Sequence, residues 1–198
     1  MTTSLSNRWL WRCATFLFAL LTSYAAGAAE PGLPPKAQVC ITCHGPGGNS
    51  ILPETPSLAG QPPFYIVMQL FLFREKQRDI PQMTPFAAEL SDQEVQRIAA
   101  YFSQQPIGQA AARIDAEKLA AGKQIVAGNH CASCHMPNLS GQNQMPRLAA
   151  QNEPYLFKAM KDYRDGHRPG YDGVMTGILR GMTDRDLEAV AHYLATFR

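Results

Sequence analysis

The chain has 198 residues, of which 45% are hydrophobic and 17% charged, with 15 glycines and 15 prolines. This balance is typical of a globular protein and excludes a disordered chain, which would be poorer in apolar residues. The length allows one ordinary domain or two small ones. The formal net charge is only +2, so charge gives no support for a nucleic-acid partner, which needs a strongly basic surface.

Residues 1–28 are typical of a cleavable secretory signal peptide. Two arginines precede an apolar run at residues 13–24, and small residues suited to cleavage follow near Ala28. The run is shorter than the roughly 20 residues that span a bilayer, so an uncleaved anchor is the less favoured alternative. We therefore expect export to the periplasm and a mature chain with 16 basic and 16 acidic side chains.

Residues 40–44 spell CITCH, and the pattern returns as CASCH at residues 131–135. A redox-active dithiol would need a preceding strand in a βαβ setting, which the pattern does not offer. Structural zinc needs four ligands but no histidine directly after the second thiol. Zinc stays open as an alternative in which Cys40, Cys43, Cys131 and Cys134 act together with two histidines.

Attachment of c-type haem explains both the spacing and the order of this motif. In one helical turn Cys40 and Cys43 lie on the same side, where their sulfurs can bond the two vinyl groups, and His44 can reach the iron. Cys131, Cys134 and His135 repeat the arrangement. We therefore expect two covalently bound haem c groups.

Cysteine counting supports haem. The chain has five cysteines, and the one at residue 13 would leave with the signal peptide. Each of the other four lies in a CxxCH motif, which leaves none for disulfides. A small exported domain without disulfides needs another source of stability, and a covalently held haem supplies it by filling the core.

The chain contains an internal duplication. The second CxxCH lies 91 residues after the first, PSLAGQ at residues 56–61 matches PRLAAQ at 146–151, and residues 83–102 match 175–194. The repeating unit is roughly 80 residues long. The duplication predicts two domains, at residues 29–107 and 108–198, joined near residues 105–112.

Each unit is expected to be helical. Ser91 and Glu94 form a capping box ahead of a helix that presents Val95, Ile98, Ala99 and Phe102 on one face. Its copy begins at Thr183 and presents Leu187, Val190, Ala191 and Leu194. A further helix is expected at about 115–126. No convincing alternating strand is present, so the predicted class is all-α.

The duplication also selects candidates for the second axial ligand of each iron. Of eight methionines, only Met83 and Met175 occupy equivalent places, each followed by threonine and each eight residues before a helix cap. The alternative is that both are ordinary core methionines and that the iron has another ligand or an open position. A thioether ligand raises the reduction potential and closes the iron to small molecules, which indicates an electron carrier and not an enzyme.

Two prolines also occupy equivalent places. Pro56 and Pro146 follow the motif histidines by 12 and 11 residues. We expect their carbonyls to orient the imidazoles through the nitrogen that faces away from iron. The alternative is an ordinary loop turn.

Together, these motifs resemble the cytochrome c4 family of periplasmic dihaem cytochromes. The resemblance rests on the two CxxCH domains, the PxLxGQ-like stretch, the helix with Tyr and Arg after it, the methionine and the LSDQE-type capped helix. The chain departs from the pattern at Ala150, where the first copy has Gly60, and in the proline-rich entry PGLPPKAQVC, which leaves the first N-terminal helix in doubt.

The resemblance implies two class I cytochrome c domains that face each other across a pseudo-two-fold axis. It implies redox protein partners, with electrons delivered from a quinol-oxidising complex to a terminal oxidase and docking at a membrane-bound complex. By position, His44 and Met83 would ligate one iron and His135 and Met175 the other, with Pro56 and Pro146 as supporting residues.

Two other functions remain open on sequence alone. One is a fixed dihaem subunit of a dehydrogenase complex, such as a sulfide or alcohol dehydrogenase, whose chemistry lies on another chain. The other is a dihaem peroxidase, in which one haem would bind carbon monoxide or cyanide readily.

The copies differ in the helix after PSLAGQ. Met68, Phe71 and Leu72 stand where the second copy has Lys158, Lys161 and Asp162. Because the second copy is charged there, we expect this apolar stripe to lie outside the haem pocket and to face outward. It would then either dock a partner or be covered by the domain interface.

Overall fold

A computed structural model describes residues 32–108, 113–168 and 173–198. The expected signal peptide, residues 1–28, lies outside these ranges. The described residues form helices and connecting loops, with a single isolated bridge between Gln142 and Met145 and no strand, so the all-α prediction is confirmed. No helix in these ranges is long and apolar enough to cross a membrane.

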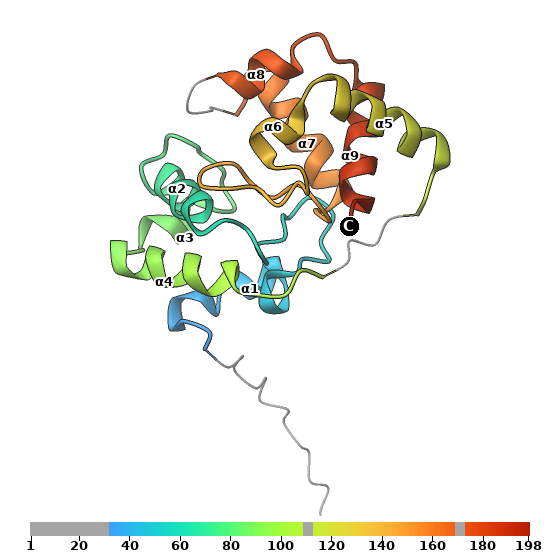
Figure 1. Ribbon diagram of the computed structural model, residues 1–198. Coiled ribbons are helices and arrows are strands. Elements are labelled where there is room, and N and C mark those ends of the chain that lie inside the picture. Colours follow the sequence, from blue (N-terminus) through green and yellow to red (C-terminus); the bar gives the residue numbers. More distant parts are fainter. Residues whose placement is uncertain (1–31, 109–112, 169–172) are drawn as a thin grey trace, which may run out of the picture.

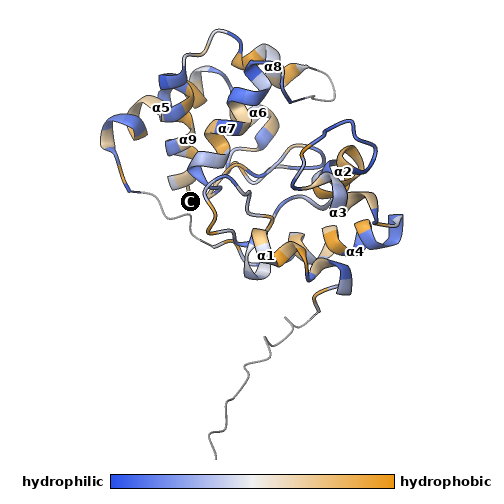
Figure 2. Cartoon of the chain, turned by 180° about the vertical axis from the view of Figure 1, so that it is seen from behind, coloured by the Kyte–Doolittle hydropathy of each residue, from blue (hydrophilic) through white to orange (hydrophobic). Residues whose placement is uncertain are grey.

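The helices fall into two groups that follow the duplication (Figure 1). The first group comprises η1 (Pro35–Ala37), α1 (Cys40–His44), η2 (Pro46–Gly48), α2 (Pro63–Arg74), α3 (Thr84–Ala88) and α4 (Asp92–Ser103). The second comprises α5 (Ala116–Gly128), α6 (Cys131–His135), α7 (Glu153–Arg164), α8 (Val174–Leu179) and α9 (Asp184–Thr196). Several helices carry apolar residues on part of their surface and polar residues on the rest (Figure 2).

The two capped helices begin where the sequence predicts. The Ser91 backbone N–H donates to Glu94 Oε2 at 2.8 Å, and the Glu94 N–H donates back to the Ser91 hydroxyl. Thr183 and Asp186 make the same reciprocal pair ahead of α9. Each box satisfies two backbone donors that a helix would otherwise leave free at its first turn.

Each domain has its own apolar core. The predicted faces of α4 and α9 are buried, including Phe102 at 0% exposed and Leu187 at 0%. The α4 face packs with α2 residues such as Ile66 and Phe73, and the α9 face packs with α7 residues such as Leu156. The periodicity therefore identified the inner faces correctly.

The two copies differ at their N-terminal ends. The second copy starts with the 13-residue α5, which runs against α9, and Gly122 permits the contact because a Cβ there would lie 2.1 Å from the Ala189 carbonyl oxygen. Among the described residues, the first copy has only the three-residue η1 in the matching place. The structure describes residues 32–37 of the matching segment, where Pro34 and Pro35 lack the N–H that an α-helix interior requires.

The apolar stripe on α2 was predicted only in part. Phe71 is 39% exposed and Met68 is half-buried, but Leu72 is 8% exposed, so Leu72 does not face solvent and fits the alternative in which the rest of the chain covers the stripe. Leu72 stands three and seven residues after Gln69 and Tyr65, on the side of α2 that meets the second domain. A comparison of sequences cannot show which side of a helix a second domain covers.

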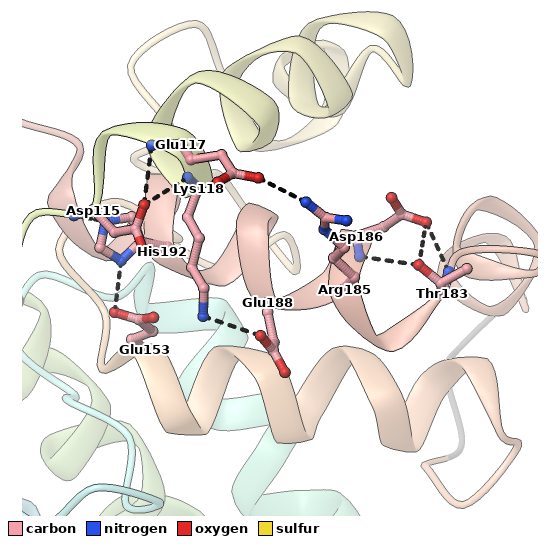
Figure 3. A network of polar contacts seen from close by, with 9 residues as sticks. All are labelled: Asp115, Glu117, Lys118, Glu153, Thr183, Arg185, Asp186, Glu188 and His192. Atoms are coloured by element: carbon pink, nitrogen blue, oxygen red, sulfur yellow. Dashed lines mark hydrogen bonds and ion pairs between the residues drawn. The ribbon is translucent and has the colours of Figure 1, made fainter.

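A histidine anchors the start of the second domain (Figure 3). His192 on α9 is 2% exposed, and its Nε2 accepts a hydrogen bond from the Asp115 backbone N–H at 3.0 Å. Because an amide can only donate, the proton must lie on Nδ1, which donates to Glu153 Oε2 at 3.0 Å. One imidazole thus joins the cap of α5 to the first turn of α7.

We expect replacement of His192 by Ala, the residue at the matching position 100, to destabilise the second domain by about 2–4 kcal/mol. The change removes two buried hydrogen bonds and leaves a cavity. Denaturant unfolding of the haem-loaded protein measures the change in the free energy of unfolding. Arg185→Ala is the control, since it breaks an exposed ion pair with Glu117 in the same network and should change little. Equal midpoints for the two variants would contradict the anchoring role.

Candidate functional site

The two motif histidines have matching environments. His44 ends α1 and is 5% exposed, and its Nδ1 lies 2.8 Å from the Pro56 carbonyl oxygen. His135 ends α6 and is 4% exposed, and its Nδ1 lies 2.9 Å from the Pro146 carbonyl oxygen. Because a carbonyl only accepts, Nδ1 carries the proton in both rings, and Nε2 keeps its lone pair available for a metal.

The electrostatic environment also favours the neutral form of both imidazoles. Burial lowers the pKa of His44 and of His135, although the proline carbonyls act in the opposite direction. Both rings are therefore neutral, as metal ligation requires. Within the described part of the chain, Nε2 of His135 is buried and has no hydrogen-bond partner. A buried polar atom without a partner is unfavourable unless a bound group satisfies it, and a haem iron fits this position.

None of the four motif cysteines forms a disulfide within the described residues. Cys40 and Cys131 are half-buried, whereas Cys43 and Cys134 are exposed. Burial raises the pKa of the Cys40 thiol to about 11 and also raises the pKa of Cys131. In the described residues no three His, Cys, Asp or Glu side chains are gathered as metal ligands. The alternative of one zinc shared by both motifs is therefore wrong, because the two motifs lie in separate domains.

The two candidate methionines also occupy matching places. Met83 caps the N-terminus of α3, and Met175 lies in the first turn of α8. Both are half-buried. Met83 packs against the core that Cys40 also contacts, and Met175 packs against the core that Cys131 contacts. The fold thus brings one CxxCH motif and one of the two candidate methionines to each core, and Met160 and Met182 also belong to the second core.

The two domains clamp each other through paired glutamines. Gln61 Oε1 accepts from the Arg147 backbone N–H at 2.9 Å, and Gln61 Nε2 donates to the Arg147 carbonyl at 3.0 Å. Gln151, the copy of Gln61, makes the same two bonds to the backbone of Ser57 at 2.7 and 2.9 Å. A residue and its copy exchange roles here, as approximate two-fold symmetry requires.

An asparagine strengthens this interface from one side. Asn152 Nδ2 lies within hydrogen-bond distance of three carbonyl oxygens of the first domain, those of Ser50, Leu52 and Thr55, at 3.3, 3.0 and 2.8 Å. These carbonyls belong to the loop between His44 and Pro56. The second domain therefore supports the loop that positions the first histidine.

Sequence reasoning missed a cluster of two arginines and two tyrosines at the interface. Arg168 donates to the hydroxyl of Tyr155 in its own domain at 3.3 Å and to that of Tyr65 in the other domain at 3.2 Å. Arg78, the copy of Arg168, donates to Gln69 Oε1 at 2.5 Å. The duplication matches Tyr65 with Tyr155 and Arg78 with Arg168. This match was the sequence signal that could have identified the cluster.

Among the described residues, Arg168 forms no ion pair with a carboxylate. The Nε atoms of Arg78 and Arg168 are buried without a hydrogen-bond partner in the described residues. Burial acts to raise the pKa of Tyr155, but the positive charges of Arg168 and Arg78 outweigh it and hold that pKa at about 8. Both arginines donate to Gln69 Oε1, and buried guanidinium nitrogens without a partner are well satisfied by anions. The carboxylates of two haem groups would supply them.

Comparison with known proteins agrees with this geometry. Residues 119–198 match the family model "Cytochrome c", and residues 34–102 match "Cytochrome C oxidase, cbb3-type, subunit III". Cytochrome c4 of Thiocapsa roseopersicina is 37% identical, with 86% of this chain and 96% of that protein covered. A thiosulfate dehydrogenase electron acceptor of Thiomonas intermedia is 34% identical, with 87% and 84% covered.

A solved structure shows the same relationship. Reduced recombinant cytochrome c4 from Pseudomonas stutzeri superposes with a TM-score of 0.77 at 32% identity, over 82% of this chain and 95% of that one. The two CxxCH sites accordingly bind two haem c groups, and the protein transfers electrons. The chain belongs to the cytochrome c4 family of dihaem class I c-type cytochromes.

Proposed function

We propose that this protein carries electrons through the periplasm from a quinol-oxidising complex to a terminal oxidase. The observation that carries the proposal is the pair of buried neutral histidines, each oriented by a proline carbonyl and each in a domain that also buries part of a methionine. Histidine and methionine together fill both axial positions of an iron and leave no open site for a substrate. This arrangement favours a carrier over the peroxidase alternative.

The geometry supports a role for each site residue. Nε2 of His44 and the sulfur of Met83 would bind one iron, and Nε2 of His135 and the sulfur of Met175 the other. Cys40, Cys43, Cys131 and Cys134 would form the thioether bonds. Pro56 and Pro146 hold the imidazole rings in place by accepting the Nδ1 protons.

The interface residues would hold the haem carboxylates. Each bound haem supplies a one-electron ferric–ferrous couple. Arg78 and Arg168 would neutralise carboxylates at the domain interface, and Tyr65 and Tyr155 would donate hydrogen bonds to them. The glutamine clamps hold the two domains at one separation, which would let an electron pass between bound haem groups without a conformational change.

A second function has specific support. The Thiomonas intermedia relative is described as an electron acceptor of thiosulfate dehydrogenase, and a thiosulfate dehydrogenase from Marichromatium purpuratum contains a region similar to this chain, with a TM-score of 0.70. This chain spans 36% of that protein. Service as the electron-accepting partner of a dehydrogenase is therefore the alternative, and it uses the same residues.

The two functions separate in a reconstituted assay. Under the primary proposal, membranes oxidise the reduced protein in air, cyanide blocks this oxidation, and added quinol reduces the haem groups again. Under the alternative, thiosulfate with purified thiosulfate dehydrogenase reduces the protein, while quinol and membranes do not. Stopped-flow absorbance of the haem bands measures each rate. Reduced protein that stays reduced with membranes in air would rule out the primary proposal.

The ligand assignment is tested by single substitutions. Met83→Ala should remove the thioether from one iron, so that half of the methionine–iron charge-transfer absorbance is lost and one reduction potential falls, because a thioether favours ferrous iron. Met175→Ala should do the same for the other haem. Met182→Ala is the matched control, since it is a half-buried methionine of the second core whose place in the first copy is taken by Leu90. Full absorbance in Met83→Ala would disprove the assignment.

A further inference from the structure

Arg147 is the largest fully buried side chain among the described residues, with 1% of its surface exposed. Its Nε donates to the Ala59 carbonyl of the first domain at 3.1 Å. One terminal nitrogen donates to the Ala149 carbonyl of its own domain. The guanidinium therefore lies inside the domain interface and contacts both domains through neutral carbonyl groups.

Among the described residues, no carboxylate offsets the charge of Arg147. In the part of the chain that the structure describes, its second terminal nitrogen is buried without a hydrogen-bond partner, and no carboxylate forms an ion pair with it. Burial lowers its pKa to about 10, which still leaves the group protonated near neutral pH. A buried cation without a carboxylate is costly for folding, because its desolvation is repaid only by neutral acceptors.

Arg147 lies beside the groups that position both histidines. It directly follows Pro146, whose carbonyl accepts from His135. Its hydrogen-bond partner Ala59 stands three residues after Pro56, whose carbonyl accepts from His44. The charge is thus held next to the histidine-positioning segment of each domain.

The first copy has no such charge. Ser57 stands in the matching position, and its hydroxyl accepts from the Ser50 N–H at 3.1 Å within the first domain. The domain clamp does not need the arginine side chain, since the bonds of both glutamines to residues 57 and 147 go to backbone atoms. The cation is an addition to one copy of a symmetrical interface.

We propose that Arg147 sets the working range of the protein by raising the reduction potentials of its two haem groups. The proposal rests on haem binding at His44 and His135. Oxidised iron carries one more positive charge than reduced iron, so a nearby buried cation disfavours the oxidised form. Because the guanidinium is shielded from solvent, dissolved salt screens it only weakly. No bond is made or broken, and the one electron gained comes from the donor protein.

The test is redox titration of Arg147→Met, which keeps most of the volume and removes the charge. Both midpoint potentials should fall, equivalent to a roughly three- to tenfold lower equilibrium constant for reduction of each haem, and the fall should persist at high salt. Arg185→Met is the control: it removes an arginine whose side chain is 85% exposed, where water and salt screen the charge, and the potentials should stay unchanged. Unchanged potentials in Arg147→Met would overturn the proposal.

Arg147→Lys separates charge from packing. Titrated at about pH 6, where even a buried lysine is more readily protonated, it should keep potentials close to those of the unaltered protein. Equal falls in the Lys and Met variants would assign the effect to packing and overturn the proposal. If Arg147→Met does not fold, Arg147→Gln carries the same expectation. The charge-transfer band, recorded on each sample, reports separately whether methionine ligation holds.

Discussion

The hydrogen bond from a histidine Nδ1 to a proline carbonyl is the interaction on which the rest of this structure depends. It occurs twice, at 2.8 and 2.9 Å. Each bond selects one tautomer, turns Nε2 inward and holds the ring at one angle. A free histidine would exchange tautomers and take up a proton near neutral pH. Without this bond, the burial of both rings and the placement of both CxxCH turns would not present a fixed Nε2 lone pair to a metal.

The segments that carry these two proline carbonyls also form the contact between the domains. The segments that begin with Pro56 and Pro146 contact each other through Gln61 and Gln151, so the two segments that orient the histidines also hold the domains together. An interface made of amides and backbone groups satisfies its polar atoms only at one relative placement of the domains. The separation between the two haem sites is therefore set by hydrogen-bond geometry more than by apolar contact.

Much of this structure could be predicted from local features of the sequence. The capping boxes at Ser91 and Thr183 need only residues three apart, and the buried faces of α4 and α9 follow from helical periodicity, so both could be inferred from the chain alone. The proline carbonyls were expected because the duplication placed them at nearly equal distances from the histidines. Leu72, Arg147 and the pairing of Arg168 with Tyr65 depend on how one domain meets the other. That is a long-range property, which no local pattern records.

Three differences between the copies share one feature, which is that the second copy has the larger polar side chain. Where the first copy has Ser57, Pro62 and Ala100, the second has Arg147, Asn152 and His192. The first two of these replacements contact the first domain, and the third anchors the start of its own domain. A symmetrical duplicate would present two equal haem sites and no preferred direction for electrons. Buried polar groups that belong to one copy alone make the two sites physically unequal, and a difference of this kind is what allows a dihaem carrier to receive an electron at one site and release it at the other.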